Sequence, residues 1–159
     1  MRRPLLLPVS LAALIACATP SSEGRAGTEA SVVSVTDGDT VRVLLEGREE
    51  PVRLIGIDTP ETDGPFTDEE CFGAEASRFT TDLLDGETVR LEFDVERRDR
   101  FDRLLAYVWL GDELANETIV REGYAQPLTI PPNVRYADRF VAAAADARAA
   151  NRGLWAACE

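Results

Sequence analysis

The sequence predicts an α+β protein whose centre is a five-stranded, OB-type Greek-key β-barrel with three helices. Two observations support this fold class. Five short segments alternate apolar and polar residues, as half-buried strands do, and tight turns join the first three of them. One helical pattern follows the third strand, and two more follow the fifth. The resulting order, βββ-α-ββ-α-α, is typical of an OB-type barrel.

The five strands are expected at residues 31–35, 40–45, 52–57, 88–93 and 104–110. Turns at residues 36–39 and 47–50 connect the first three strands into a meander, because Asp-Gly pairs and single glycines favour tight connections. An acidic segment at residues 59–70 follows the third strand and is too long for a tight turn. The aromatic residues Phe101, Tyr107 and Trp109 are expected in the barrel core.

The three helices are expected at residues 73–84, 114–122 and 133–151. Glycines follow the first two helices as stop signals, and Pro131-Pro132 precedes the third. The first helix should bury the face formed by Phe72, Ala76, Phe79 and Leu83. The third helix should bury the stripe formed by Val134, Ala137, Val141 and Ala144.

The amino-acid composition excludes several kinds of catalysis and metal binding. The chain has 159 residues, 45% of them apolar, which suits one domain with a modest core. It has no histidine, which excludes Ser-His-Asp and Cys-His catalysis and every histidine metal site. All 17 basic residues are arginine, and the formal net charge is −12, so composition alone does not suggest non-specific attraction to nucleic acid.

The N-terminus has the composition of an export signal. Two arginines precede an apolar run at residues 5–15, and residues 14–17 (LIAC) resemble a bacterial lipobox with Cys17 as the lipidated residue. The alternative is ordinary secretion with cleavage after the A-x-A-like residues 16–18. We therefore expect residues 1–16 to be a signal peptide, 17–30 a lipidated cysteine and flexible tether, and 31–159 the folded domain. The protein would then be exported, either as a membrane-anchored lipoprotein of the cell envelope or in secreted form, touching the membrane only through this lipid.

If Cys17 carries lipid, Cys71 and Cys158 remain as an even pair in an oxidising compartment. A disulfide between them is expected, and two free buried thiols are the alternative.

Polar residues occupy the connections where this order of elements should bring them together. Asp37 and Asp39 lie in the first turn, Asp58 and Glu61 at the exit of the third strand, and Arg53 within that strand. Asp39 and Asp58 have the hard oxygen atoms that Ca²⁺ or Mg²⁺ prefers. Either motif alone suits an ordinary turn. A second arginine, Arg103, comes after Asp99, and the simpler alternative is that these two residues form an ion pair on a strand surface.

Five segments in order resemble the staphylococcal nuclease (thermonuclease) family: residues 35–41 (VTDGDTV), 52–62 (VRLIGIDTPET), 72–77 (FGAEAS), 99–107 (DRFDRLLAY) and 116–123 (NETIVREG). The resemblance covers residues 31–155. It implies the SNase-like fold and a Ca²⁺-dependent nuclease, an endonuclease that hydrolyses phosphodiester bonds of DNA and/or RNA to 3′-phosphate products. Single-stranded or denatured DNA and RNA would be its substrates, and a monomer is the expected state.

The resemblance also implies the site residues. Asp39 and Asp58 would bind Ca²⁺ with their carboxylates, Thr59 would add its backbone carbonyl, and Asp37 would be a supporting carboxylate nearby. The implied catalytic residues are Glu61, as general base for the attacking water, and the two arginines that grip the scissile phosphate, Arg53 and Arg103. The alternative function is a catalytically silent OB-barrel module that binds nucleic acid or a protein partner.

Two further segments carry expectations. Where family members often place tyrosines against the nucleotide, this sequence has Thr129 and Pro131, and Tyr136 lies too far along to replace them. Weaker substrate binding is therefore expected. Arg97 and Arg98 are expected in a solvated turn of mixed charge, since neighbouring acidic residues offset them.

Overall fold

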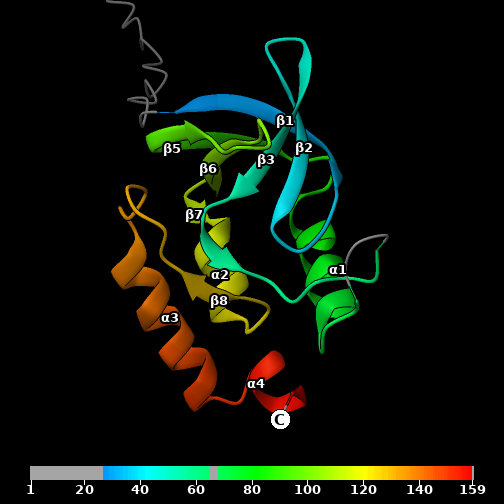
Figure 1. The fold of residues 1–159 in the computed structure, drawn as a ribbon, viewed down its shortest axis with the longest axis vertical. Helices are drawn as coiled ribbons and strands as arrows, with labels where there is room; N and C mark the ends of the chain where they lie inside the picture. Colours follow the sequence, from blue (N-terminus) through cyan, green and yellow to red (C-terminus); the bar gives the residue numbers. More distant parts are fainter. Residues whose placement is uncertain (1–26, 65–67, 159) are drawn as a thin grey trace, which may run out of the picture.

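The computed structural model describes residues 27–64 and 68–158, and in this part of the chain a closed β-barrel is covered by helices on one side (Figure 1). The barrel strands are β1 (Thr28–Val35), β2 (Thr40–Leu45), β3 (Arg48–Leu54), β5 (Thr88–Arg98) and β6 (Leu104–Leu110). They follow the order β3-β2-β1-β5-β6 with antiparallel pairing, and a parallel pairing of β3 with β6 closes the barrel. This mixed five-stranded barrel confirms the predicted fold class.

Strand β1 begins three residues earlier than expected, so residues 28–30 belong to the barrel and not to the tether. The signal peptide, Cys17 and the rest of the tether up to residue 26 lie outside the described residues. Strand β5 continues five residues beyond its predicted end, to Arg98.

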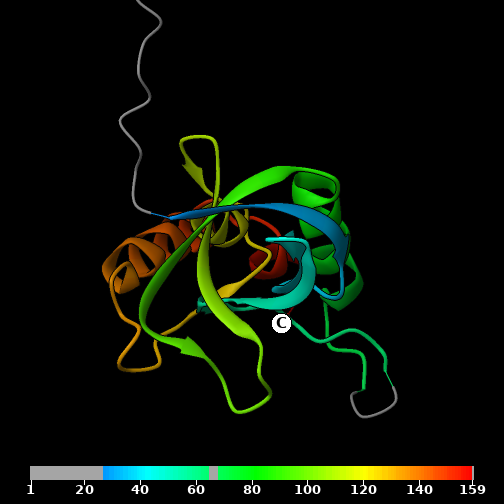
Figure 2. The same ribbon diagram turned by 90° about the horizontal axis from the view of Figure 1, so that it is seen from above.

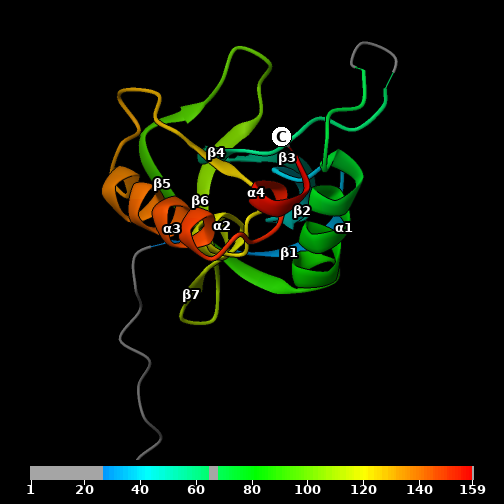
Figure 3. The same ribbon diagram turned by 90° about the horizontal axis from the view of Figure 1, so that it is seen from below.

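The helices are α1 (Gly73–Leu84), α2 (Ala115–Arg121), α3 (Ala137–Ala149) and the single turn α4 (Leu154–Ala157), which the sequence analysis did not include. Helix α1 packs beside the barrel, whereas α2, α3 and α4 lie below it (Figures 1 and 3). Within the described ranges, no helix has both the length and the apolar composition needed to cross a membrane.

The predicted third strand is in fact two strands. It is interrupted at Ile55, and the short strand β4 (Gly56–Asp58) leaves the barrel and pairs with β8 (Gln126–Leu128). Gly56 makes this possible, because its φ is +82° and the space of a Cβ atom is occupied by the ring of Phe140. A further strand, β7 (Glu113–Leu114), extends the sheet beside β6.

The buried stripe predicted for the third helix is wrong at Val134 and Val141 and confirmed at Ala144. Val134 and Val141 are 44% and 57% exposed, whereas the buried side chains of α3 are Phe140, Ala143, Ala144 and Ala147. The helix is rotated because Phe140 fills the space that Gly56 leaves. It also begins at Ala137, four residues later than predicted. The preceding segment is held as a loop by Asn133, whose Oδ1 accepts from N of Glu96 (2.8 Å) and whose Nδ2 donates to O of Glu96 (2.9 Å).

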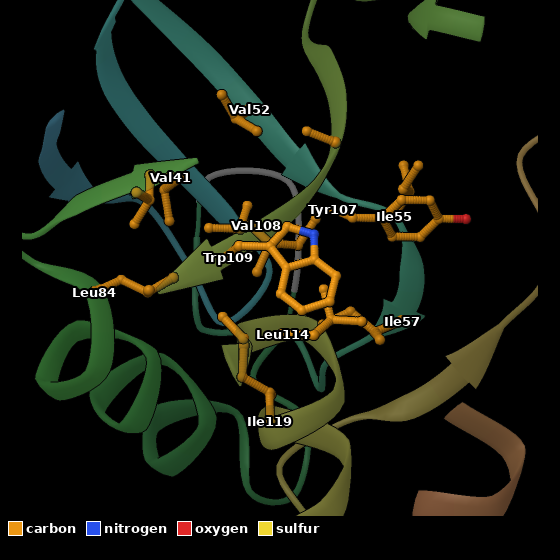
Figure 4. Packing of buried hydrophobic residues seen from close by; sticks show 14 of the residues in the cluster. Val41, Val52, Ile55, Ile57, Leu84, Tyr107, Val108, Trp109, Leu114 and Ile119 are labelled. Atoms are coloured by element: carbon orange, nitrogen blue, oxygen red, sulfur yellow. The ribbon is translucent and has the colours of Figure 1, made fainter. Parts of the chain in front are cut away.

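The core fills the barrel and the space between the barrel and the helices (Figure 4). Tyr107 and Trp109 are buried there, as predicted. Phe101 is not, because it lies in the β5–β6 loop and is 64% exposed. Buried Asn116 ties α2 to the barrel, since it accepts from N of Val108 (2.9 Å) and donates to O of Ile55 (2.9 Å). Each of these bonds satisfies a polar group that would be costly to bury alone.

A disulfide joins Cys71, immediately before α1, to Cys158 at the end of the described chain. This is the pair that the sequence analysis singled out. The bond ties the C-terminal turn to the segment that follows the acidic loop. Because it closes a loop of 87 residues, the chain-entropy model gives it about 4 to 5 kcal/mol of stabilisation.

Candidate active site

Asp39 lies in the turn between β1 and β2, and its carboxylate is buried. Oδ2 accepts hydrogen bonds from N of Thr59 (3.1 Å) and from Oγ1 of Thr59 (3.2 Å). Oδ1 accepts one from Oγ1 of Thr40 (3.2 Å). Asp37 shapes the turn, since its Oδ1 accepts from N of Asp39 (3.1 Å). The turn therefore fixes the direction of the Asp39 carboxylate.

Gly38 allows this turn to lie directly against Thr59. A Cβ atom at Gly38 would stand 2.6 Å from Oγ1 of Thr59, far inside ordinary contact distance. The Gly38 carbonyl also accepts a hydrogen bond of 2.6 Å from Oγ1 of Thr80 on α1. Because the chain approaches Thr59 so closely, only a glycine fits at position 38. The contact brings the β1–β2 turn, which carries Asp39, against the segment that carries Asp58 and Thr59.

Arg53 lies between the two predicted metal-binding carboxylates. Its Nη1 forms an ion pair with Oδ2 of Asp39, and its Nη2 lies 3.0 Å from Oδ1 of Asp58. The Arg53 side chain is 15% exposed, whereas the Asp58 side chain is largely exposed. The guanidinium of Arg53 therefore already contacts both carboxylates.

Arg103 reaches the same place from the start of β6. The parallel pairing of β3 with β6 puts Arg53 opposite Leu105, two residues after Arg103. Nη1 of Arg103 lies 3.4 Å from Oγ1 of Thr40, which in turn contacts Asp39. The ion pair of Arg103 with Asp99, given above as the simpler alternative, also exists, with Nε at 2.8 Å from Oδ2, and it orients the guanidinium.

Glu61 follows β4 in the long acidic loop. Its backbone is fixed by Glu70, whose N donates to O of Glu61 (2.9 Å) and whose Oε2 accepts from N of Glu61 (3.1 Å). Gly73, the first residue of α1, packs directly against the Glu61 carbonyl, so a larger residue would collide there. This loop and the β5–β6 loop project from the same side of the barrel (Figures 2 and 3).

The electrostatics reflect this crowding of carboxylates. Burial raises the pKa of Asp39 to about 6; Asp37 adds to the rise, and Arg53 opposes it. Partial burial also raises the pKa of Glu61, and the negative charges of Asp37 and Asp58 add to that rise. A further positive charge close to Asp39, Asp58 and Glu61 would stabilise the ionised forms of these carboxylates.

A cleft of about 580 Å³ opens beside the two arginines. Its lining includes Arg53, Arg103, Phe101, Leu128, Ile130 and Asn133. Thr129, expected at the nucleotide position, is not part of this lining, and neither is Tyr136. Tyr136 instead packs edge-on against Tyr107, and its hydroxyl donates a hydrogen bond to Glu92 (3.0 Å); it immediately precedes α3 and is not inside the helix as expected.

Sequence reasoning missed two residues of this cleft. Phe101 was expected in the core but is exposed, and the guanidiniums of Arg100 and Arg103 lie 4.6 and 5.6 Å from its ring centroid. Asn133 was expected to begin a helix but holds the loop that forms the cleft wall. The flanking charges around Phe101 were the available signal, since a loop of alternating acids and arginines rarely buries its aromatic residue.

The donor set fits a hard divalent cation. The described residues contain no group of three or more histidine, cysteine, aspartate or glutamate side chains positioned to hold a metal. They do offer the carboxylates of Asp39 and Asp58, which converge on one cationic group, with Thr59 adjoining both. Two carboxylates are a sparse set of ligands, and they suit a cation whose coordination is completed by a backbone carbonyl and water molecules.

Comparison with known proteins agrees with this geometry. The family model described as "Staphylococcal nuclease homologue" matches residues 51–157. A thermonuclease of Staphylococcus hyicus is 43% identical over 124 residues, which cover 78% of this chain and 73% of that protein. A thermonuclease of Staphylococcus intermedius is 42% identical over 135 residues, covering 85% of this chain and 80% of that protein. The endonuclease YncB of Bacillus subtilis (strain 168) is 35% identical over 146 residues, covering 84% of this chain and 69% of that protein.

The family match spans the strands, loops and helices that position both arginines, Asp58 and Glu61. The predicted resemblance is confirmed, and the chain belongs to the staphylococcal nuclease family of hydrolases.

Proposed function

We propose that this nuclease hydrolyses phosphodiester bonds of single-stranded or denatured DNA and RNA in a Ca²⁺-dependent reaction that leaves 3′-phosphates. One observation carries the proposal. Arg53 and Arg103 both line the cleft, Arg53 contacts the carboxylates of Asp39 and Asp58, and Arg103 reaches Thr40 beside Asp39. Anion-binding and cation-binding groups therefore lie side by side, as an anionic ester with a divalent cation requires.

The two arginines are proposed to bind the scissile phosphate. Attack by water adds charge to the phosphoryl oxygens, and planar guanidinium groups on two sides stabilise that charge through paired N–H donors. Asp99 holds Arg103 in place through Nε, and Nη1 makes only a long hydrogen bond of 3.4 Å to Oγ1 of Thr40, so the Nη groups can be turned to the substrate. Both Nη atoms of Arg53 contact carboxylates in this structure, and a cation bound by Asp39 and Asp58 would release them to the phosphate.

Glu61 is proposed as the general base that takes a proton from the attacking water. Glu61 is exposed and its backbone is fixed at both N and O, and its carboxylate is near enough to Asp58 and Arg53 for their charges to act on it. The raised pKa of Glu61 brings its basicity closer to that of a water molecule being deprotonated near neutral pH. Asp37 is proposed to support this basicity through its negative charge.

Asp39 and Asp58, with the backbone carbonyl of Thr59, are proposed to hold Ca²⁺. When bound, the ion would supply positive charge to the phosphate and a binding place for water. The hydrogen bonds that Asp39 accepts from Thr59 keep its carboxylate oriented whether or not the ion is present. Ca²⁺ is favoured over Mg²⁺ because a loose set of two carboxylates, a carbonyl and waters suits the larger, geometrically tolerant ion.

The test is digestion of heat-denatured DNA by the purified domain with Ca²⁺, with Mg²⁺ and with chelator. Acid-soluble product with Ca²⁺ that disappears with chelator supports the proposal. Full activity with Mg²⁺ and a calcium-selective chelator would refute the choice of metal. A folded protein that binds the DNA without cutting it would favour the catalytically silent module.

We further propose that the protein acts outside the cytoplasm as a monomer. The export-type N-terminus supports this localisation, and the Cys71–Cys158 disulfide is a bond typical of oxidising compartments. Mass spectrometry of the protein from a membrane fraction decides between the two export routes. A diacylglyceryl group on Cys17 supports anchoring, whereas an unmodified, freely soluble chain supports secretion.

A further inference from the structure

A second cleft, of about 640 Å³, lies at the end of the barrel where the β2–β3 hairpin meets the end of β5. Apolar side chains line its base: Leu45, Phe93 and Leu104. Its charged lining consists of three arginines and two glutamates: Arg48, Arg97, Arg98, Glu46 and Glu50. On a chain of net charge −12, this excess of arginines is a local departure from the overall charge.

Arg98 lines both clefts and is fixed in place. Its Nη1 lies 3.0 Å from Oε2 of Glu50 and donates to O of Asp102 (2.7 Å). In the barrel register, Arg98 is opposite Leu104, the residue that follows Arg103. The second cleft therefore adjoins the first at Arg98, and the two form one path across the barrel surface.

The other two arginines are available to a ligand. Neither Arg48 nor Arg97 forms an ion pair with a carboxylate of the described residues. The guanidinium of Arg97 lies 4.2 Å from the ring centroid of Phe93, which fixes its plane and leaves its N–H edges free. Arg97 and Arg98 are exposed and Arg98 is paired with acidic residues, as the sequence predicted, but they lie at the end of β5 and not in a turn, and both line the cleft.

The adjoining clefts suit an extended strand of nucleic acid. Arg48 and Arg53 are five residues, or about 16 Å, apart along β3, and their side chains leave opposite faces of the strand. The connection between the two clefts therefore runs over Arg98, which lines both. A chain held at Arg53 by its scissile phosphate would reach Arg48 after a few nucleotides. Barrels of this type contact several nucleotides of a single strand through a groove with basic side chains.

We propose that the second cleft is an additional subsite, in which Arg48 and Arg97 bind backbone phosphates of a polynucleotide a few nucleotides away from the bond that is cut. This inference rests on the proposed function. It adds that the affinity for a substrate depends on the length of the nucleic-acid strand. Strands that reach the second cleft should bind more tightly than a dinucleotide, which occupies the first cleft alone.

The experiment compares Arg97→Ala and Arg48→Ala with Arg78→Ala. Arg78 is an exposed arginine of α1 that lines neither cleft, so its loss removes the same charge. KM is measured with Ca²⁺ on a 20-nucleotide deoxythymidine strand and on a dinucleotide. Each cleft variant should raise KM of the long strand about twofold to fivefold relative to Arg78→Ala, and raise that of the dinucleotide less.

Binding of the same 20-nucleotide strand, labelled with fluorescein, is measured by anisotropy in chelator, so that it can be followed without turnover. Each cleft variant should reduce the slope of log Kd against log salt by about 0.7, as expected for one lost phosphate contact on a single strand. Glu46→Gln should have the opposite effect and tighten binding of the long strand.

Equal effects on both substrate lengths, or effects no larger than those of Arg78→Ala, would overturn the subsite. Loss of cleavage in every variant and in the parent protein would instead count against the proposed function, because the anisotropy measurement would still report on the second cleft.

Discussion

Nη2 of Arg53 lies 3.0 Å from Oδ1 of Asp58, although the two residues are five positions apart along what the sequence predicts to be one strand. In a continuous strand they would be about 16 Å apart and would point to opposite faces. The interruption at Ile55 and the positive φ of Gly56 turn the chain, so that Asp58 comes back beside Arg53.

The first prediction concerns the metal. Arg53 neutralises Asp39 and Asp58 in the absence of a divalent cation, so Arg53→Gln should lower the stability of the metal-free protein by about 3 kcal/mol. Ca²⁺ should then raise Tm more in this variant than in the parent protein, because the carboxylates have lost their own cation. Thermal melts with Ca²⁺ and with chelator measure this. Arg103→Gln is the matched control, and an equal Ca²⁺-dependent rise in both variants would contradict the idea.

The second prediction concerns Gly56. Gly56→Ala should destabilise the fold by about 2 kcal/mol or more, because alanine is strained at φ +82° and its Cβ would enter the ring of Phe140. Urea unfolding measures the loss. Gly47 also has a positive φ but has nothing within 4 Å of its Cβ position, so Gly47→Ala should cost only the strain, about 1 kcal/mol. Similar losses at both positions would show that packing against Phe140 is unimportant.

The third prediction concerns catalysis. Glu61→Gln and Arg103→Ala should each lower kcat by about two or more orders of magnitude, because one removes the proposed base and the other a charge on the phosphate. Glu61 is exposed and the Arg103 side chain is 30% exposed, so Tm should change little. Arg53→Ala is a less clean test, since its partly buried ion pair with Asp39 also supports the fold. Wild-type turnover by folded Glu61→Gln would remove this residue from the mechanism.

The fourth prediction concerns the cleft wall. Ile130 lines the cleft and is 62% exposed, whereas Thr129 does not line it, so Ile130→Tyr should lower KM on a short single strand and Thr129→Tyr should not. Stacking of a base on an added aromatic ring contributes about 1 to 3 kcal/mol. Removing Phe101 should have the opposite effect on KM, and none of these changes should greatly alter kcat, because they contact the base and not the phosphate. If Thr129→Tyr alone improved KM, the loop would differ from this arrangement.

The fifth prediction concerns pH. Partial burial pushes the pKa of Asp99 upward, but hydrogen bonds from the side chain and backbone of Arg103 and from N of Phe101 outweigh it, so the pKa lies below its ordinary value. A lowered pKa stabilises the fold above the unfolded pKa of about 3.9, and this contribution is lost as the pH falls through the folded value. Asp99→Asn should therefore reduce the free energy of unfolding by about 1 to 2 kcal/mol at pH 7, and by progressively less as the pH falls below the unfolded pKa. A constant difference across this range would show that the charge of Asp99 is not what matters.

The sequence determined the elements that depend on local pattern. The strand at residues 40–45, the strand at 104–110 and the helix at 73–84 have the predicted bounds, because alternation and 3.6-residue periodicity are properties of neighbouring residues. The motifs around Asp39, Asp58 and Arg103 were visible for the same reason. Their place in the order of elements, with the family resemblance, was enough to indicate the barrel and the chemistry.

Only the tertiary structure decided which of these residues meet. The parallel pairing of β3 with β6 brings Arg103 to Arg53, and the pairing of β4 with β8 turns Asp58 back to Arg53; both depend on contacts between residues far apart in the chain. The face of α3 was chosen by the fit of Phe140 over Gly56, which no helical period encodes. Phe101 is exposed because Asp99 and Arg103 close the loop around it, and burial of an aromatic residue depends on what surrounds it in space.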